Sequence, residues 1–152
     1  MFHIICDMIK LRIVLDTNVI VAGVSSNQGA SYQLLKEIPG QSFIMLVSVP
    51  LFVEYEATLK RQEICKAHGL PHHDVDILLQ VWAKVCKPVS LHFLWRPQLR
   101  DPGDEMVLET AINGGAHALV TFNTTDFRQA CPRFGVDLWT PATLLGRLRR
   151  RT

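Results

Sequence analysis

Short, continuous apolar runs alternate with longer amphipathic stretches along this chain of 152 residues. The apolar runs have the length and composition of strands buried on both faces of a sheet, and they cover residues 12–15, 43–47, 89–93, 118–121 and 136–139. The stretches between them place apolar residues at helical spacing and predict helices over residues 17–24, 30–38, 50–67, 72–85 and 103–113, with a last helix from Pro141. This alternation predicts an α/β fold, an α/β/α sandwich around a central, mainly parallel sheet of about five strands.

Residues that start and stop helices support these boundaries. Pro50 and Pro141 suit the first turn of a helix, and Thr140 is the expected N-cap of the last one. Gly69 and Pro71 are expected to stop the helix that begins near Pro50. In the helix that follows, one apolar stripe is predicted to face the core and comprises Ile77, Leu78, Val81, Trp82 and Val85.

The composition is that of one globular domain, which we expect to span residues 1–152. Hydrophobic residues make up 48% and charged residues 20%, whereas a disordered chain would carry fewer apolar residues. Residues 1–10 are apolar but lack the basic start and the cleavage site of a signal peptide, and they are too short to span a membrane. Met8 offers a second start directly before the first strand, so we interpret residues 1–10 as an N-terminal extension. We expect a cytoplasmic protein without a membrane segment.

Net charge and cysteine spacing exclude more than they identify. The formal charge of +2 is too small to indicate a nucleic-acid-binding protein by itself. Basic residues do crowd the C-terminus, either as a solvated end or as phosphate contacts; they are Arg147, Arg149, Arg150 and Arg151. The cysteines contain no Cys-x-x-Cys pair, which argues against a zinc site and favours single thiols; they are Cys6, Cys65, Cys86 and Cys131.

An acidic residue ends the first predicted strand. Asp16 directly follows residues 12–15, at the carboxyl end of a strand, where open α/β sheets bind their ligands. A cap of the following helix explains Asp16 equally well when it is considered alone, because Thr17 and Asn18 suit a turn.

Further acids and amides lie near other predicted strand ends. Glu54 lies in an apolar stretch, where a carboxylate is costly without a cation or donor, with a solvent-facing position as the alternative. Asp104 is placed on or beside the inward stripe of the helix over 103–113, where Asp101 is the expected N-cap. Asn123 and Asp126 follow the fourth predicted strand, and Asp126 is most simply a further cap.

These positions together predict a divalent-metal site. The carboxyl ends of parallel strands share one edge of a sheet, and carboxylates gathered there would raise each other's pKa unless a cation neutralised them. Oxygen ligands without a Cys or His partner favour Mg²⁺ or Mn²⁺ over zinc.

Four segments, in this order and spacing, resemble the PIN-domain ribonuclease family. They are residues 13–19 (IVLDTNV), 54–55 (EY), 101–111 (DPGDEMVLETA) and 115–123 (GAHALVTFN). The resemblance spans residues 11–143 and is greatest to the VapC-like toxins of bacterial toxin–antitoxin systems.

The resemblance implies a metal-dependent endoribonuclease that cleaves single-stranded RNA and leaves a 5′-phosphate. It assigns Asp16, Glu54 and Asp104 as ligands of Mg²⁺ or Mn²⁺, and it implies a cognate antitoxin and a homodimer. We expect four residues to support these ligands, namely Asn18, Asp101, Thr121 and Asp126. The chain departs from the family at Asn123, where members place an Asp, and this change puts a second metal in doubt. Arg96 and Arg100 are either guides for the RNA backbone or parts of a solvated loop.

Three alternatives stay open. A haloacid-dehalogenase phosphatase also begins with a strand ending in Asp, but it needs a second Asp two residues later, where this chain has Asn18. A DNA nuclease would use the same metal site. A catalytically weakened module that binds RNA or a partner would account for Asn123, although it would leave the clustered carboxylates unexplained.

Overall fold

The computed structural model describes residues 9–93 and 98–151. Cys6, Arg96, most of the proposed N-terminal extension and the start of the predicted loop at 95–100 therefore lie outside the described residues. The strands are β1 (Arg12–Leu15), β2 (Ile44–Ser48), β3 (Lys87–Val89), β4 (Ala118–Val120) and β5 (Asp137–Trp139). The helices are α2 (Thr17–Ser25), α3 (Ala30–Glu37), α4 (Val49–Leu59), α5 (Gln62–His68), α6 (His72–Val85), α7 (Pro102–Asn113), α8 (Thr124–Phe127), α9 (Ala130–Arg133) and α10 (Pro141–Arg150).

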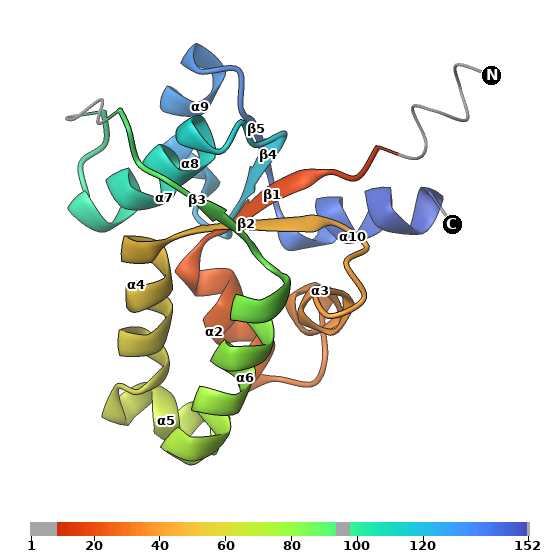
Figure 1. Ribbon diagram of the computed structural model, residues 1–152, viewed down its shortest axis with the longest axis vertical. Coiled ribbons are helices and arrows are strands. Elements are labelled where there is room, and N and C mark those ends of the chain that lie inside the picture. Colours follow the sequence, from red (N-terminus) through yellow and green to blue (C-terminus); the bar gives the residue numbers. More distant parts are fainter. Residues whose placement is uncertain (1–8, 94–97, 152) are drawn as a thin grey trace.

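The sheet has five parallel strands in the order β3-β2-β1-β4-β5. The chain moves from β1 outwards to β2 and β3, and then returns to add β4 and β5 on the other side of β1. Since crossovers between parallel strands are right-handed, this reversal places α2 to α6 on one face and α7 to α9 on the other, as Figure 1 shows. The predicted α/β sandwich with its parallel sheet is confirmed.

The reversal creates a topological switch point between β1 and β4. In open parallel sheets, ligands bind outside the carboxyl ends of the strands at such a point. Leu15 pairs with Val120 at the last register position of the two strands, so Asp16 and Thr121 emerge side by side there. The Asp16 N–H donates to the Val120 carbonyl at 2.9 Å and extends the ladder by one residue.

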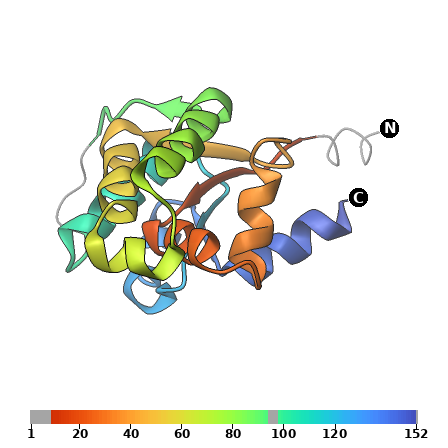
Figure 2. The same cartoon turned by 90° about the horizontal axis from the view of Figure 1, so that it is seen from below.

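Strand burial and helix packing explain the near-continuous apolarity of the strands. Ile13, Val14 and Leu15 are fully buried because helices cover both faces of β1. Helix α7 packs across β1, β2 and β4, and α10 returns to lie against α3 (Figure 2). No helix in the described part of the chain is long and apolar enough to cross a membrane.

The single helix predicted over residues 50–67 is wrong, because the chain breaks between α4 and α5. Arg61 adopts an extended conformation and starts a new helix without any Gly or Pro nearby. Two side chains from α5 satisfy the Leu59 carbonyl exposed at the break: Cys65 Sγ lies 3.3 Å away and His68 Nε2 2.8 Å away. These contacts replace the backbone hydrogen bonds that a continuous helix would have made.

The third strand is also displaced from its prediction at residues 89–93. It covers Lys87–Val89 at the edge of the sheet, where Pro88 is tolerated because an edge strand need not donate on both sides. Beyond it, the His92 and Phe93 N–H groups donate to the Asn113 side chain at 3.0 Å instead of to a neighbouring strand.

The stripe predicted for α6 is partly wrong. Its fully packed residues are Val75, Leu79 and Trp82, whereas Ile77 is 46% exposed. The face of α6 that packs on the core is therefore the one that carries Val75, Leu79 and Trp82, and it is turned about the helix axis from the predicted stripe.

Candidate active site at the sheet switch point

Asp16 is held by donors from two elements. It is the N-cap of α2, and its Oδ1 accepts from the Thr17 N–H at 2.7 Å. Its Oδ2 accepts from the Thr121 hydroxyl at 2.8 Å, across the switch point. The side chain is only 7% exposed. The cap and the site explanations of Asp16 are therefore compatible, because one oxygen serves each.

The Thr121 hydroxyl links the segments that follow β1 and β4. While it donates to Asp16, it accepts from the Asn123 N–H at 2.9 Å and from Asn18 Nδ2 at 3.3 Å. Asn18 Oδ1 in turn accepts from the Phe122 N–H at 3.4 Å. The structure thus brings Asn18 and Thr121 together with Asp16, as the sequence led us to expect.

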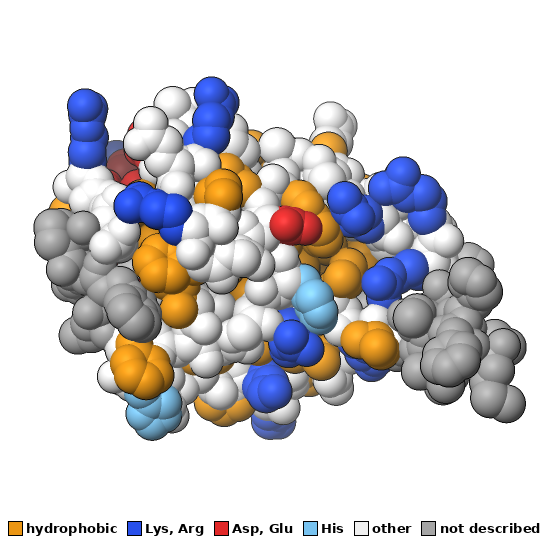
Figure 3. Space-filling view, turned by 90° about the horizontal axis from the view of Figure 1, so that it is seen from above, with side chains coloured by type: hydrophobic (Ala, Val, Ile, Leu, Met, Phe, Trp, Pro, Cys, Tyr) orange, Lys and Arg blue, Asp and Glu red, His pale blue; other side chains and the backbone are white. Residues whose placement is uncertain are grey.

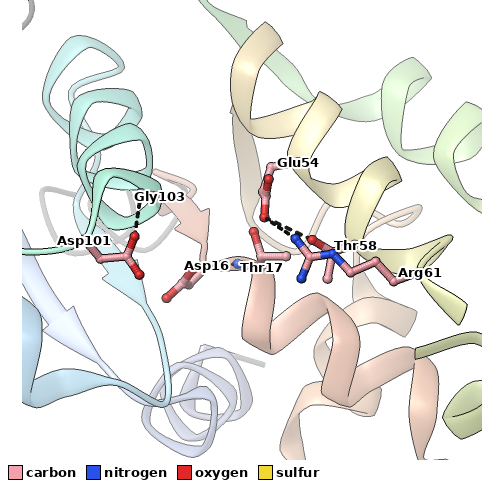
Figure 4. Close-up of polar contacts among 7 residues, drawn as sticks. All are labelled: Asp16, Thr17, Glu54, Thr58, Arg61, Asp101 and Gly103. Carbon is pink, nitrogen blue, oxygen red and sulfur yellow. Dashed lines mark hydrogen bonds and ion pairs between the residues drawn. The ribbon is translucent and has the colours of Figure 1, made fainter. Parts of the chain in front are cut away.

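Asp104 and Asp101 reach the site from the N-terminus of α7. Asp101 is the N-cap, with Oδ1 accepting from the Gly103 N–H at 2.8 Å, and Pro102 takes the first position. Partial burial, together with the nearby carboxylates of Asp16, Asp101 and Asp126, raises the pKa of Asp104 to about 6. Figure 4 shows the carboxylates of Asp101 and Asp16 turned towards one another.

Burial also raises the pKa of Asp16, against the opposing effect of its hydrogen bonds from Thr121 and Thr17. The carboxylates of Asp101 and Glu54 add smaller contributions in the same direction as burial. Both central acids therefore favour their neutral forms more than usual, which is the electrostatic condition that a bound cation would reverse.

Glu54 occupies a more peripheral position than the sequence suggested. Its Oε1 accepts from the Thr58 hydroxyl at 3.0 Å and lies 3.8 Å from Arg61 Nη2, so the side chain runs along α4 (Figure 4). Both Glu54 and Arg61 are substantially exposed, so this ion pair is weak and leaves the carboxylate available.

Asn123 and Asp126 form a pair of their own. Asn123 precedes the first turn of α8, and its Nδ2 donates to Asp126 Oδ2 at 2.6 Å. The expected helix-cap role of Asp126 is wrong, since Asn123 occupies the N-cap position and Asp126 lies inside the helix.

The donor set suits a hard cation, although the side chains are not drawn together around one point. Within residues 9–93 and 98–151, no three acidic, His or Cys side chains are close enough to share a metal ion. The available donors at the switch point are carboxylate, hydroxyl and amide oxygens, which Mg²⁺ and Mn²⁺ prefer. The mutual repulsion of the carboxylates supplies the reason for such an ion to bind.

Two residues that support the site were not identified from the sequence. Glu105, only 4% exposed, accepts from the N–H groups of Gln98 at 2.5 Å and Leu99 at 2.7 Å, and so holds the segment leading to Asp101. The buried Tyr55 hydroxyl donates to the Leu15 carbonyl, one residue before Asp16. For Glu105 a signal was present, because helical spacing places it one turn before the buried Leu108.

Comparison with known proteins agrees with the fold. A family profile described as PIN domain matches residues 12–125, which include every acid discussed above except Asp126. The chain therefore belongs to the PIN-domain family, whose members are generally nucleases that typically use divalent metal ions.

Similarity to individual proteins is more distant. No curated protein matches the chain. Among solved structures, the chain superposes with a TM-score of 0.58 on one chain of VapBC2 from Rickettsia felis. That crystal structure shows VapBC2 bound to a DNA fragment from the VapBC2 promoter. The sequence identity is 14%, and the match covers 86% of this chain and 98% of the other, so the likeness concerns the fold.

Proposed function

We propose that this protein is a divalent-metal-dependent endoribonuclease that cleaves single-stranded RNA. The observation that carries the proposal is the placement of Asp16 and Asp104, with their neighbouring acids, at the switch point of a PIN-domain sheet. The Mg²⁺ or Mn²⁺ ion would be held by Asp16 and Asp104, with Glu54 completing the site directly or through water.

Phosphodiester hydrolysis requires a nucleophile and compensation of the charge that builds up on the phosphate. A bound divalent cation supplies both, because it lowers the pKa of water and neutralises phosphate oxygens. The Thr121 hydroxyl keeps Asp16 oriented, and Asn18 keeps Thr121 in place. Glu54 is exposed enough to accept a proton from the attacking water.

A cleavage assay tests the proposal directly. We expect purified protein, freed of any inhibitor, to cut single-stranded RNA with Mg²⁺ or Mn²⁺, and to lose this activity in EDTA. Asp16→Asn should be slower by about a hundredfold, because a metal ligand has lost its charge. Asp137→Asn, which changes an exposed acid at the opposite edge of the sheet, should cleave as the wild type does.

The remaining outcomes discriminate between the alternatives. Equal cleavage by Asp16→Asn, or activity that persists in EDTA, would contradict the assignment. Equal cleavage of single-stranded DNA of the same sequence would make the protein a broader nuclease. RNA binding without cleavage would favour a catalytically weakened module, for which Asn123 and the spread of the acids are the supporting observations.

Asn123 provides a separate prediction about metal affinity. Asn123→Asp replaces a hydrogen-bond donor to Asp126 with a second carboxylate. We expect the metal-free variant to lose about 0.5–1 kcal/mol of stability through like-charge repulsion. Mn²⁺ should bind several times more tightly, measured by isothermal titration calorimetry, because the site gains a negative charge.

The double variant Asn123→Asp/Asp126→Asn is the matched control, since it exchanges the two groups and keeps the total charge. Its Mn²⁺ affinity should return towards that of the wild type. Unchanged or weaker binding by Asn123→Asp alone would exclude a role for residue 123 in metal binding.

We further propose that the protein is the toxin of a toxin–antitoxin pair, acts in the cytoplasm and forms a homodimer. The structural likeness to a chain of the VapBC2 complex supports a protein partner. A partner that blocks the acidic site should co-purify from the native host and suppress RNA cleavage. Light scattering of the separated protein should give twice the chain mass of 17.2 kDa.

A further inference from the structure

An exposed aromatic residue, Phe122, lies in the segment that follows β4 at the candidate active site. Phe122 is 56% exposed, although it directly follows Thr121, the residue that holds Asp16. It precedes Asn123, which contacts Asp126. Its position between residues of the site suggests that the ring contacts a ligand there.

The backbone around Phe122 is fixed on both sides. Its own N–H donates to Asn18 Oδ1 at 3.4 Å, and the next N–H, of Asn123, donates to the Thr121 hydroxyl at 2.9 Å. The ring is therefore presented from an ordered turn, which reduces the entropy that would be lost on binding.

The surroundings of Phe122 favour a nucleobase over a protein surface. Every other side chain in residues 121–126 is polar, so this segment does not itself form an apolar patch of the kind that docks a protein. An exposed aromatic ring beside a charged groove is the usual arrangement for binding single-stranded nucleic acid, because each base offers a face for stacking.

A groove of about 440 Å³ adjoins the same turn, between residues 98–100 and helices α8 and α9. Arg100 and Arg128 both line it, together with Asp126. Asp126 belongs to both the groove and the acid cluster, because it accepts from Asn123 and contributes to the pKa of Asp104. The groove is thus continuous with the candidate active site.

The two arginines are available for an anion. Both are exposed, and within the described part of the chain neither forms an ion pair or a hydrogen bond. Lys and Arg side chains also outnumber Asp and Glu on the face shown in Figure 3, which looks down on α8 and α9. A surface with this excess of positive charge attracts the phosphate backbone of a nucleic acid.

We propose that Phe122 stacks on a base of the RNA strand, and that Arg100 and Arg128 bind phosphates of the same strand in the adjoining groove. The inference rests on the proposed ribonuclease function and adds how the substrate is held. Stacking tolerates any base, so Phe122 would supply affinity for an unpaired strand without selecting its sequence.

The proposed role of Phe122 is tested by measuring RNA binding under conditions that prevent cleavage. The probe is a fluorescein-labelled single-stranded oligouridine of about ten nucleotides, titrated in EDTA so that metal-dependent cleavage does not interfere. We expect Phe122→Ala and Phe122→Leu to bind about tenfold more weakly, and Phe122→Trp at least as tightly as the wild type. Phe93→Ala is the matched control, because Phe93 is 61% exposed but lies beside Asn113, at the other end of α7 from Asp104.

Salt dependence tests the groove independently. Arg100→Gln and Arg128→Gln should each reduce the slope of log affinity against log salt by about 0.7, the value for one phosphate contact on a single strand. Phe122→Ala should leave the slope unchanged, since stacking releases no counterion. An unchanged slope in both arginine variants would exclude the groove as the path of the strand.

The outcomes separate this inference from the proposed function. If Phe122→Ala binds and cleaves as the wild type does, the stacking role is wrong while the nuclease stands. Full binding by Phe122→Leu would exclude stacking in favour of a simple apolar contact.

If Phe122→Ala alters only the oligomeric state in light scattering, the ring belongs to a protein interface. If the wild type neither binds nor cleaves RNA, both proposals fail. With Mg²⁺ present, a stacking role predicts a raised KM and an unchanged kcat for Phe122→Ala.

Discussion

Asp104→Asn is expected to slow RNA cleavage strongly and, in the absence of metal, to make the protein more stable. The pKa of Asp104 is about 6 in the folded protein against an ordinary value of 3.8, so the folded state binds the proton more tightly than the unfolded state does. The stabilisation that this proton provides is complete below about pH 4 and is lost as the pH rises through about 6. At pH 8 the wild type therefore bears the repulsion among its carboxylates, whereas the neutral Asn does not.

The stability gain at pH 8 should be about 1–2 kcal/mol, after allowance for solvent screening of this partly exposed group. For a chain of this size that corresponds to roughly 3–6 °C in Tm. Cleavage should fall by about a hundredfold or more, because the substitution removes a ligand charge. At pH 4 the difference in Tm should vanish, since Asp104 is then protonated in the folded wild type.

Differential scanning fluorimetry with and without Mn²⁺ measures both effects. Mn²⁺ should raise the Tm of the wild type through preferential binding to the folded state, and raise that of Asp104→Asn far less. Asp137→Asn is the control, because it alters an exposed acid away from the site and should respond to Mn²⁺ as the wild type does. A variant less stable than the wild type at pH 8 without metal would show that the acids do not repel one another as described.

Among the variants considered, Glu105→Ala is expected to lower the free energy of unfolding most, by about 2–4 kcal/mol. One carboxylate oxygen, almost fully buried, accepts from two backbone N–H groups, those of Gln98 and Leu99. Alanine removes the shared acceptor of these two part-buried N–H groups, at a cost of about 1–2 kcal/mol for each hydrogen bond to the carboxylate. The Tm should fall by roughly 10 °C, and urea denaturation should give a lower midpoint with an unchanged slope.

Glu105→Gln separates the hydrogen bonds from the charge. Its amide oxygen can still accept from both N–H groups, so the loss should be less than half of that in the alanine variant. Amide exchange at Leu99 should accelerate strongly in Glu105→Ala and little in Glu105→Gln. If both variants are as stable as the wild type, Glu105 does not anchor residues 98–101.

The layers of the fold were predictable because they depend on local patterns. Continuous apolar runs mark strands covered on both faces, and their alternation with helices implies right-handed parallel crossovers. The capping residues Asp101 and Thr140 act on their own helix ends, so they too were predictable from the sequence. The break before Arg61 was not, because the groups that satisfy it come from the next helix.

The acids of the site were predictable individually, but their relations were not. Asp16 and Asp104 stand where a strand ends or a helix begins, which the sequence marks locally. Glu54 was placed correctly on its helix, where it pairs with Thr58 one turn later, yet its ion pair with Arg61 lies across the helix break. The burial of Glu105 escaped notice because an Asp-Glu pair at a helix start is usually solvated.

The sequence by itself determined the α/β class and which acids, amides and hydroxyls stand at strand ends and helix starts of the candidate site, since these follow from the order of residues along short segments. Tertiary structure alone decided that Thr121 bonds to Asp16 across 105 residues, that Phe122 is exposed beside it, and that Arg100 and Arg128 line one groove. The physical reason is the reversal of strand order at β1, which brings distant loops to one edge of the sheet. The hydrophobic periodicity of a single segment does not indicate which distant loops will lie next to each other.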